Sequence, residues 1–247
     1  MTLTLPMLAP DLGVDGVQIR VTTRLGGVSD PPYESLNLGG HVGDVATHVE
    51  ENQLRLRQSL PVSRLQWLNQ VHGTRVVEAP HAKAVEADAQ WTCDSGVAMG
   101  ILTADCLSVV LAAEDGACIG VAHAGWRGLA AGILESLLSA MPTDNGRIVG
   151  WLGPAIGATA YEVGPEVRSA LMASSSAESD ECFAPSNERD GHWMADLAGL
   201  AKRRLECVGV ARVLGGDHCT YSEPSQFFSH RRDGPATGRM ATVIWRS

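Results

Sequence analysis

Residues 97–128 read VAMGILTADCLSVVLAAEDGACIGVAHAGWRG, and this stretch decides the fold. It contains three consecutive apolar runs, at residues 97–103, 106–113 and 117–122. The length and β-branched content of these runs are typical of buried strands. Asp115-Gly116, between the second and third runs, is a turn signal for a β-hairpin. The stretch therefore predicts three buried strands, two of them joined as a hairpin.

The length of the hairpin loop decides which side chains meet across the two strands. A two-residue loop pairs Cys106 with Gly125 and Ser108 with His123. Because side chains alternate along a strand, Cys106 and Ser108 share a face, and Cys106 becomes a diagonal neighbour of His123 at roughly 7–8 Å. A loop with an odd number of residues puts Cys106 and His123 on opposite faces instead.

Strand-like and helix-like segments alternate over the rest of the chain without a regular βαβ rhythm. Further strands are predicted at residues 17–22, 65–71, 74–78, 147–152, 212–215 and 240–245. Helices are predicted at residues 44–60, with Asp44 as the N-cap, and at 127–141, 166–173 and 194–207. This mixture predicts an α+β fold, a layered sandwich of mixed β-sheets whose outer faces are covered by helices.

Composition indicates a globular protein. The chain has 247 residues, of which 45% are hydrophobic and 19% charged, and we expect one domain over residues 1–247. The formal net charge of −9 argues against nucleic acid or an anionic membrane as a partner. The N-terminus shows no signal peptide, and the chain has no apolar run long enough to span a membrane, so we expect a cytoplasmic protein. We also expect it to be a monomer.

The six cysteines show no CxxC pair and no spacing typical of a disulfide framework. In a reducing compartment most of them are expected to be small buried hydrophobic side chains.

Two histidines and one cysteine stand at strand ends, where catalytic groups often lie. His72 follows a strand in the turn VHG, Cys106 precedes the central apolar run, and His123 ends a strand before AGWRG. Each also has an ordinary explanation: a surface histidine, a buried structural thiol and a hydrogen-bonded core histidine. No spacing among them is that of a short metal-ligand pair, so the residues alone do not indicate zinc.

Arginines beside glycines form a second group of candidates. Arg127 lies at the start of a predicted helix, and Arg231 and Arg232 lie in FFSHRRDGPATGR (227–239). Solvated surface charge is the ordinary explanation. In an acidic protein, arginines in glycine-rich loops also suit the capture of phosphate or carboxylate groups by bidentate contacts.

Long motifs identify the chain as a member of the YfiH-like laccase-domain family, now regarded as purine nucleoside phosphorylases. The motifs are TTRLGGVSDPPYESLNLGGHVGD (22–44), NQVHG (69–73), ADAQWT (87–92), ILTADCLSVVL (101–111), GVAHAGWRGLAAGIL (120–134), LGPAIGATAYEVGPEV (152–167), HCT (218–220) and FFSHRRDGPATGRMATVIW (227–245). The resemblance implies a fold similar to the catalytic domain of a deamidating bacterial toxin. It also implies a zinc site of His72, Cys106 and His123, with one coordination position open for water or substrate.

The activity that the resemblance implies is zinc-dependent phosphorolysis of adenosine, inosine and methylthioadenosine, with adenosine deaminase activity. The expected partners are purine nucleosides and phosphate. Arg127, Arg231 and Arg232 are the candidates for holding phosphate, and Asn37, in SLNLG, for hydrogen-bonding the sugar or base.

Three alternatives remain open at this point. Cys106 can be the nucleophile of a cysteine hydrolase or deamidase with His123 as its base. The family's older name implies a copper-dependent polyphenol oxidase, although the chain has none of the His-x-His pairs that multicopper oxidases use. Finally, Cys219 or His218 can close a purely structural zinc site as a fourth ligand.

Overall fold

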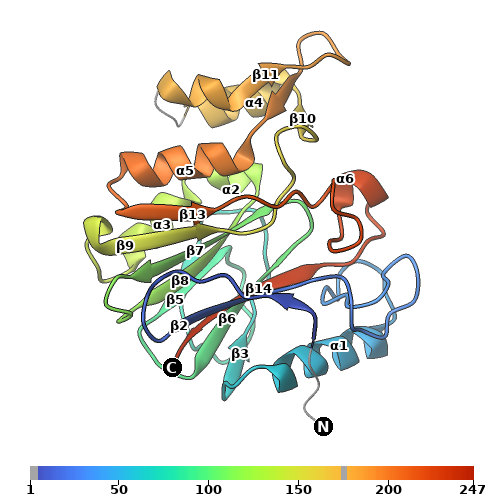
Figure 1. Cartoon of the computed structure of the whole chain (residues 1–247), viewed down its shortest axis with the longest axis vertical. Helices are drawn as coiled ribbons and strands as arrows, with labels where there is room; N and C mark the ends of the chain where they lie inside the picture. Colours follow the sequence, from blue (N-terminus) through green and yellow to red (C-terminus); the bar gives the residue numbers. More distant parts are fainter. Residues whose placement is uncertain (1–4, 174–176) are drawn as a thin grey trace.

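The computed structural model describes residues 5–173 and 177–247, which form two large β-sheets packed face to face between layers of helices (Figure 1). The predicted α+β arrangement, a layered sandwich of mixed sheets covered by helices, is confirmed. Apolar side chains from both sheets fill the space between them, among them Met99, Ile101, Val110, Val121 and Trp151.

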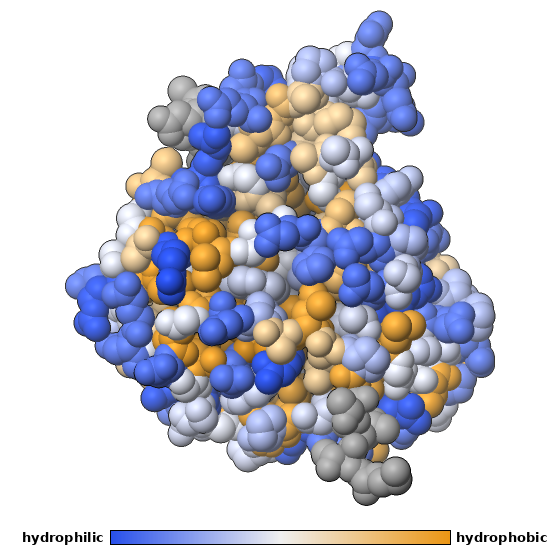
Figure 2. Space-filling view, viewed as in Figure 1, coloured by the Kyte–Doolittle hydropathy of each residue, from blue (hydrophilic) through white to orange (hydrophobic). Residues whose placement is uncertain are grey.

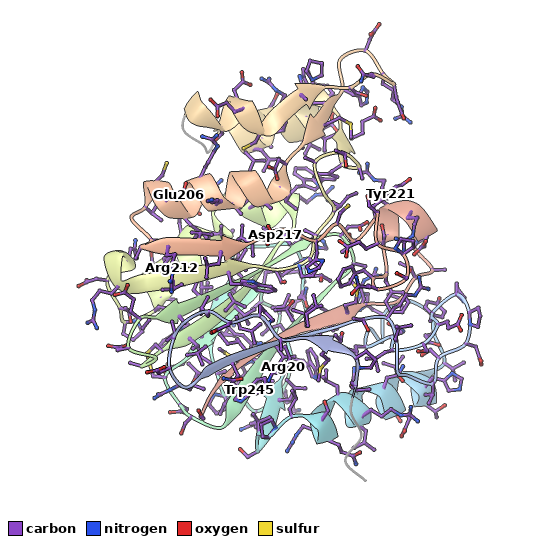
Figure 3. All side chains as sticks on the ribbon, in the orientation of Figure 1. Arg20, Glu206, Arg212, Asp217, Tyr221 and Trp245 are labelled. Carbon is purple, nitrogen blue, oxygen red and sulfur yellow. A yellow bond between two sulfur atoms is a disulfide. The ribbon has the colours of Figure 1, made fainter. Side chains whose placement is uncertain are left out.

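The first sheet contains the C-terminal strand at its centre. Its strand order is β1 (Met7–Leu8), β2 (Val17–Thr22), β14 (Met240–Arg246), β6 (Val97–Thr103) and β3 (Arg64–Gln66). β14 is antiparallel to both neighbours, and Arg20 of β2 lies over the ring of Trp245 of β14 at 5.5 Å (Figure 3). Helix α1 (Ala46–Ser59) covers the outer face of this sheet by burying residues such as Leu56 against Val243 and its neighbours.

The second sheet carries the predicted hairpin. Its strand order is β13 (Arg212–Gly215), β9 (Ile148–Leu152), β7 (Leu107–Ala113), β8 (Ile119–Ala124), β5 (Ala89–Thr92) and β4 (Val76–Glu78). Every residue of β7 and β8 is buried, because the first sheet covers one face of these strands and helices cover the other. Both strands are therefore apolar except for Ser108 and His123.

Helices α2 (Trp126–Ala131), α3 (Ile133–Ala140) and α5 (Leu197–Cys207) pack on the outer face of the second sheet. The smaller elements are η1 (Asn145–Arg147), β10 (Glu162–Val163), α4 (Pro165–Ala173), η2 (Ala177–Cys182), β11 (Phe183–Pro185), β12 (Trp193–Ala195) and α6 (His230–Asp233). α4 and the sheet β10-β12-β11 project beyond the layers, and the loop at residues 186–192 forms a hydrophilic tip (Figures 1 and 2). In the described part of the chain, the helices are all too short or too polar to traverse a bilayer.

Three predicted helices differ in detail from the structure. The helix expected at residues 194–207 begins only at Leu197, because its first residues belong to strand β12 and Asp196 is the N-cap. The helix expected at residues 127–141 is interrupted at Gly132, whose φ of +96° ends α2 and starts α3. Asp44 does not cap α1: Val45 is the N-cap residue, and the Asp44 carboxylate instead accepts hydrogen bonds from Ser29 and Asn37. The strand expected at residues 65–71 ends early, at Gln66.

The expectation that most cysteines are small buried hydrophobic side chains is wrong in two respects. Only Cys118 and Cys182 are buried, and two of the cysteines are bonded to each other. Cys93 and Cys118 form a disulfide between the segments that flank β5 and β8. The two strands are antiparallel, with Thr92 opposite Ile119. Cys93, which follows Thr92, therefore lies opposite Cys118, which precedes Ile119. The two cysteines are 25 residues apart, and this strand pairing, which brings them together, was not predicted.

Candidate metal centre and substrate cavity

The hairpin register brings Cys106 next to His123. Ser108 pairs with His123 and Leu107 with Ala124, as the two-residue loop predicts. Cys106 lies immediately before β7, in the short turn that carries the chain from the first sheet to the second. Asp105 takes a φ of +86° in this turn, and its carboxylate accepts hydrogen bonds from the Thr220 hydroxyl and the Arg231 backbone N–H. Asp105 thereby fixes the direction in which Cys106 leaves the turn.

His72 is held in place by a buried carboxylate. Its φ is +61°, a left-handed conformation that is uncommon outside glycine. The Asp88 carboxylate stabilises this turn by accepting the backbone N–H groups of Val71, His72 and Gly73 at 3.2, 2.9 and 2.7 Å. Asp88 directly precedes β5, so the second sheet determines where the turn lies.

The three predicted ligands converge in space. Ligand atoms of His72, Cys106 and His123 all lie within 4.8 Å of one another, with Cys106 Sγ 3.9 Å from His72 Nε2. The imidazole rings contact edge to face, with centroids 4.7 Å apart. Two imidazole nitrogens and a thiolate at this spacing suit a zinc-sized ion, since Zn–N and Zn–S bonds are about 2.0 and 2.3 Å long. His123 is buried and His72 is exposed, so the group opens toward solvent on one side.

The backbone at Gly125 makes room for this group. A Cβ atom at Gly125 would lie 3.0 Å from His72 Cδ2, 3.1 Å from Cys106 Sγ and 3.6 Å from His123 Nε2. The space that a methyl group would fill therefore borders all three ligand side chains. A glycine here keeps that space free for an ion and its open coordination position.

Charge interactions favour a thiolate in this group. Burial alone would raise the pKa of the Cys106 thiol, but the positive charge of His123 and hydrogen bonds from both imidazoles lower it to about 6. Burial alone would lower the pKa of His123, but the Cys106 thiolate and the Asp88 carboxylate raise it to about 9. The site is thus arranged to hold a negative sulfur beside a positive centre, which is the charge arrangement of a thiolate bound to a metal.

Neither residue considered as a fourth ligand joins the three. Over residues 5–173 and 177–247, the only group of three or more His, Cys, Asp or Glu side chains close enough to hold a metal is His72, Cys106 and His123. His218 Nδ1 contacts Glu223 at 3.0 Å, and Cys219 Sγ accepts the backbone N–H of Gly157 at 3.2 Å. A metal in this group would therefore keep a position open, as catalytic sites do.

The three side chains border a cavity of about 610 Å³. This volume is within the range of small-molecule sites. Besides the three ligands, the wall combines cationic, aromatic, amide and aliphatic side chains with one carboxylate: His41, Leu68, Asn69, Gln70, Leu102, Thr103, Ala104, Asp105, Trp126, Arg127, Ile156, Tyr161, Leu197, His230, Arg231 and Arg239. Arg127 stacks on Trp126 with its guanidinium 4.3 Å from the ring, and Arg231 lies over Tyr161 at 5.2 Å.

Two of the four predicted substrate-binding residues lie outside the cavity lining. Asn37 is fully buried, and its amide bonds the backbone of Gly39 and Arg239 and the carboxylate of Asp44. Arg232 donates to three backbone carbonyls and pairs with Asp233. The polar groups of both side chains thus hold loops in place, and a substrate contact for either residue stays a prediction.

The structure also adds residues to the site that were not singled out. Asp88, which contacts two of the three ligand residues, lies in the motif ADAQWT (87–92) but has no ligand-like spacing to mark it. Tyr161 and His41 line the cavity from loops far from the ligands in sequence. The sequence does contain a hint of the role of Arg239, because this residue ends the segment in which Arg231 and Arg232 stand among turn glycines.

Comparisons with known proteins agree over nearly the whole chain. The family model described as multi-copper polyphenol oxidoreductase laccase matches residues 18–247. A Pseudomonas aeruginosa protein named purine nucleoside phosphorylase is 48% identical, over 93% of both chains. The Escherichia coli protein named purine nucleoside phosphorylase YfiH is 47% identical over 93% of this chain and 94% of its own. The crystal structure of a Neisseria meningitidis protein superposes with a TM-score of 0.93 at 41% identity, covering 98% of this chain and 99% of that one.

Proposed function

Because the chain belongs to the multi-copper polyphenol oxidoreductase laccase family, whose members include the YfiH proteins, we propose that it is a metal-dependent purine nucleoside phosphorylase. One observation carries the proposal: a three-ligand His-Cys-His group opens into a cavity of nucleoside size, and the arginines in its wall form no ion pair with any described residue. The proposed substrates are adenosine, inosine and methylthioadenosine, with phosphate as the second substrate. Deamination of adenosine is proposed as a side activity.

We propose zinc as the resident metal, held by His72, Cys106 and His123. When bound, it would supply a Lewis acid with one open coordination position. The donor set of two imidazoles and one thiolate suits zinc. A trinuclear copper centre requires more histidines than the two found together among the described residues. A single copper ion in the same group remains the alternative to zinc, and metal analysis of the purified protein distinguishes them.

The remaining cavity residues are proposed to bind and orient the substrates. Trp126 and Tyr161 present aromatic rings on which a purine can stack, and Ile156 and Leu197 add apolar surface. Arg127 and Arg231 lie at the solvent-exposed side, where their charges attract anionic phosphate into an otherwise acidic protein.

The direct test is turnover of a nucleoside panel by the metal-loaded protein. We expect adenosine and phosphate to give adenine and ribose 1-phosphate, and deamination to give inosine and ammonia, all resolved by liquid chromatography. Cys106→Ala should lose both the metal and the activity. Cys207→Ser, at an exposed cysteine far from the cavity, should retain both. Absence of purine-base release from every nucleoside by metal-loaded protein would contradict the proposal.

A cysteine hydrolase is the second candidate, because Asp88 contacts the side of His123 that faces away from Cys106. His123 Nδ1 contacts the buried carboxylate of Asp88 at 2.8 Å, which gives the order of a Cys-His-Asp triad through Cys106. This candidate requires activity without metal. Deamidation of a glutamine-containing peptide by chelator-treated protein, lost in Cys106→Ser, would favour it over the phosphorylase.

We further propose that residues 1–247 act as one domain, as a monomer in the cytoplasm, with no nucleic acid or membrane partner. The acidic net charge of −9 supports the last point. Light scattering coupled to size-exclusion chromatography tests the monomer: a molar mass near twice the 26.1 kDa of the chain would contradict it.

A further inference from the structure

The cavity contains three arginines without a carboxylate partner. Arg127, Arg231 and Arg239 all line it, and none of them forms an ion pair within residues 5–173 and 177–247. Elsewhere in the described chain, seven arginines do pair with a carboxylate. Three arginines and one carboxylate, that of Asp105, line the cavity, so its wall carries more positive than negative side chains in a protein with a net charge of −9. This local excess of positive charge favours an anionic ligand.

Arg239 differs from the other two in its surroundings. Arg127 and Arg231 are exposed and stacked on aromatic rings. Arg239 is half-buried, and its burial lowers the pKa of the guanidinium. Only its Nη1 is hydrogen-bonded, to the carbonyls of Thr237 and Gly238, so Nε and Nη2 have no hydrogen-bond partner in the described chain. A partly desolvated guanidinium with two free N–H directions binds an oxyanion more strongly than an exposed one.

A dedicated loop holds Arg239 in this position. The Asn37 side-chain oxygen accepts the backbone N–H groups of Gly39 and Arg239, and the Arg239 carbonyl accepts the N–H of Leu38. Gly39 lies so close that a Cβ there would be 2.7 Å from Arg239 Cγ. The glycine is therefore needed for the Arg239 side chain to lie against the loop.

His41 extends the same positive region toward the metal ligands. Burial and the positive charges of Arg239 and His72 lower the pKa of His41, which places its ring near both residues. The imidazole lines the cavity and makes no hydrogen bond to any described residue. Arg239 in turn experiences the charge of Cys106 and lines the same cavity, so this region lies near the metal group.

We propose that Arg239 and His41 form the subsite that binds the phosphate co-substrate, an inference that rests on the proposed phosphorolysis. Arg239 donates two N–H groups to phosphate oxygens, and the His41 ring contacts a third. A phosphate oxygen bonds to ribose C1′ as the C1′–N9 bond breaks. The electron pair of that bond goes to the purine, which also takes up the proton of hydrogen phosphate. Arg127 and Arg231 then attract phosphate to the mouth without being its final ligands.

The experiment combines a binding measurement with kinetics on metal-loaded protein. Inorganic phosphate is titrated into the protein in a calorimeter, and the KM values for phosphate and for adenosine are measured separately. Arg239→Gln is expected to weaken phosphate binding and to raise the phosphate KM by about 10- to 100-fold, as expected for loss of a charge-assisted pair of hydrogen bonds. The adenosine KM should stay within about twofold, which a general structural defect would not allow, and Arg239→Lys should restore part of the loss.

A second pair of variants displaces the guanidinium without removing it. Gly39→Ala places a methyl group against Arg239 Cγ and should weaken phosphate binding, whereas Gly40→Ala, with nothing within 4 Å, should not. If Arg239→Gln and Gly39→Ala leave phosphate binding and its KM within twofold while adenosine is still cleaved, the subsite assignment is wrong and the phosphorylase proposal stands. If wild-type protein cleaves no nucleoside but binds phosphate in an Arg239-dependent way, the phosphorylase proposal is wrong and Arg239 still belongs to an anion-binding subsite.

Discussion

Asp88 and His123 are joined by two hydrogen bonds: Oδ1 of Asp88 lies 2.8 Å from Nδ1 of His123, and the Asp88 carbonyl accepts the His123 backbone N–H at 2.7 Å. The carboxylate assigns the proton to Nδ1 and leaves Nε2 for a metal. The same carboxylate holds the His72 turn through three backbone N–H groups. One buried residue therefore orients two of the three proposed ligands.

Asp88→Asn should weaken metal binding and lower the stability of the fold. The substitution turns one carboxylate oxygen into an amide N–H₂ that faces donors, so at least one hydrogen bond to His123 or to the His72 turn is lost. We expect the metal dissociation constant to rise by about 10- to 100-fold and the free energy of unfolding to fall by about 1–3 kcal/mol. Competition with a chromophoric chelator and urea titration measure the two quantities. Unchanged metal affinity in a folded variant would show that Asp88 does not act through the ligands.

Gly125→Ala tests the space between the ligands directly. The φ of −61° and ψ of 158° at Gly125 are allowed for alanine, so backbone strain is not introduced. The added methyl group would instead lie 3.0–3.6 Å from atoms of His72, Cys106 and His123. We expect metal affinity to fall by at least about tenfold while the unfolding free energy changes by less than about 1–2 kcal/mol, a modest overpacking effect.

Gly146→Ala is the matched control for that substitution. A methyl group at Gly146 would meet only a carbonyl oxygen, at 3.9 Å, and this glycine lies in η1, far along the chain from the ligands. The metal content of this variant, measured by atomic emission spectrometry, should equal that of the wild type. Full metal occupancy in Gly125→Ala with normal affinity would argue against an ion between these three side chains.

Local signals in the sequence were sufficient to predict the hairpin and its register, but not the break in the helix that follows it. Asp115-Gly116 lies between two apolar runs, and the two-residue loop that it predicts sets the register that places Cys106 beside His123. The chain in fact turns over residues 114–117, with the Gly116 N–H bonded to the Ala113 carbonyl, and this even number of residues keeps the same register. The break at Gly132 was missed because the apolar period continues on both sides of it, at Leu129 and Ile133. A glycine in a helical pattern does not reveal whether it will take a positive φ.

A related point applies at the site, where contacts between distant segments decide how a polar side chain is used. Asn37 and Arg232 have suitable chemistry for binding sugar or phosphate, and residue type alone does not show whether their donors are used by the protein's own backbone. The role of Asp88 depends on strand β5 lying beside β8, a pairing between segments without a short connecting turn. Non-local pairing of this kind also placed Cys93 opposite Cys118.

Asn37→Ala should act on stability and on Arg239, and not through a direct contact with the nucleoside. The fully buried Asn37 amide serves the backbone of Gly39 and Arg239 and the carboxylate of Asp44, so its removal leaves buried groups unpaired. We expect the free energy of unfolding to fall by about 2–3 kcal/mol, measured by urea titration, with a raised phosphate KM in the protein that remains folded. A raised adenosine KM with unchanged stability would instead restore the role that the sequence suggested.

Reduction of the Cys93–Cys118 disulfide should lower stability and leave the site assembled. The bridge closes a loop of 25 residues, for which the chain-entropy model gives about 3–4 kcal/mol of stabilisation. It lies at the opposite end of β5 and β8 from Asp88 and His123, so metal content should not depend on it. Urea titrations with and without a thiol reductant should differ by that amount in the wild type and not in Cys93→Ser, while Cys207→Ser should behave as the wild type. Equal stabilities of oxidised and reduced wild-type protein, with the bridge verified by mass spectrometry, would contradict this expectation.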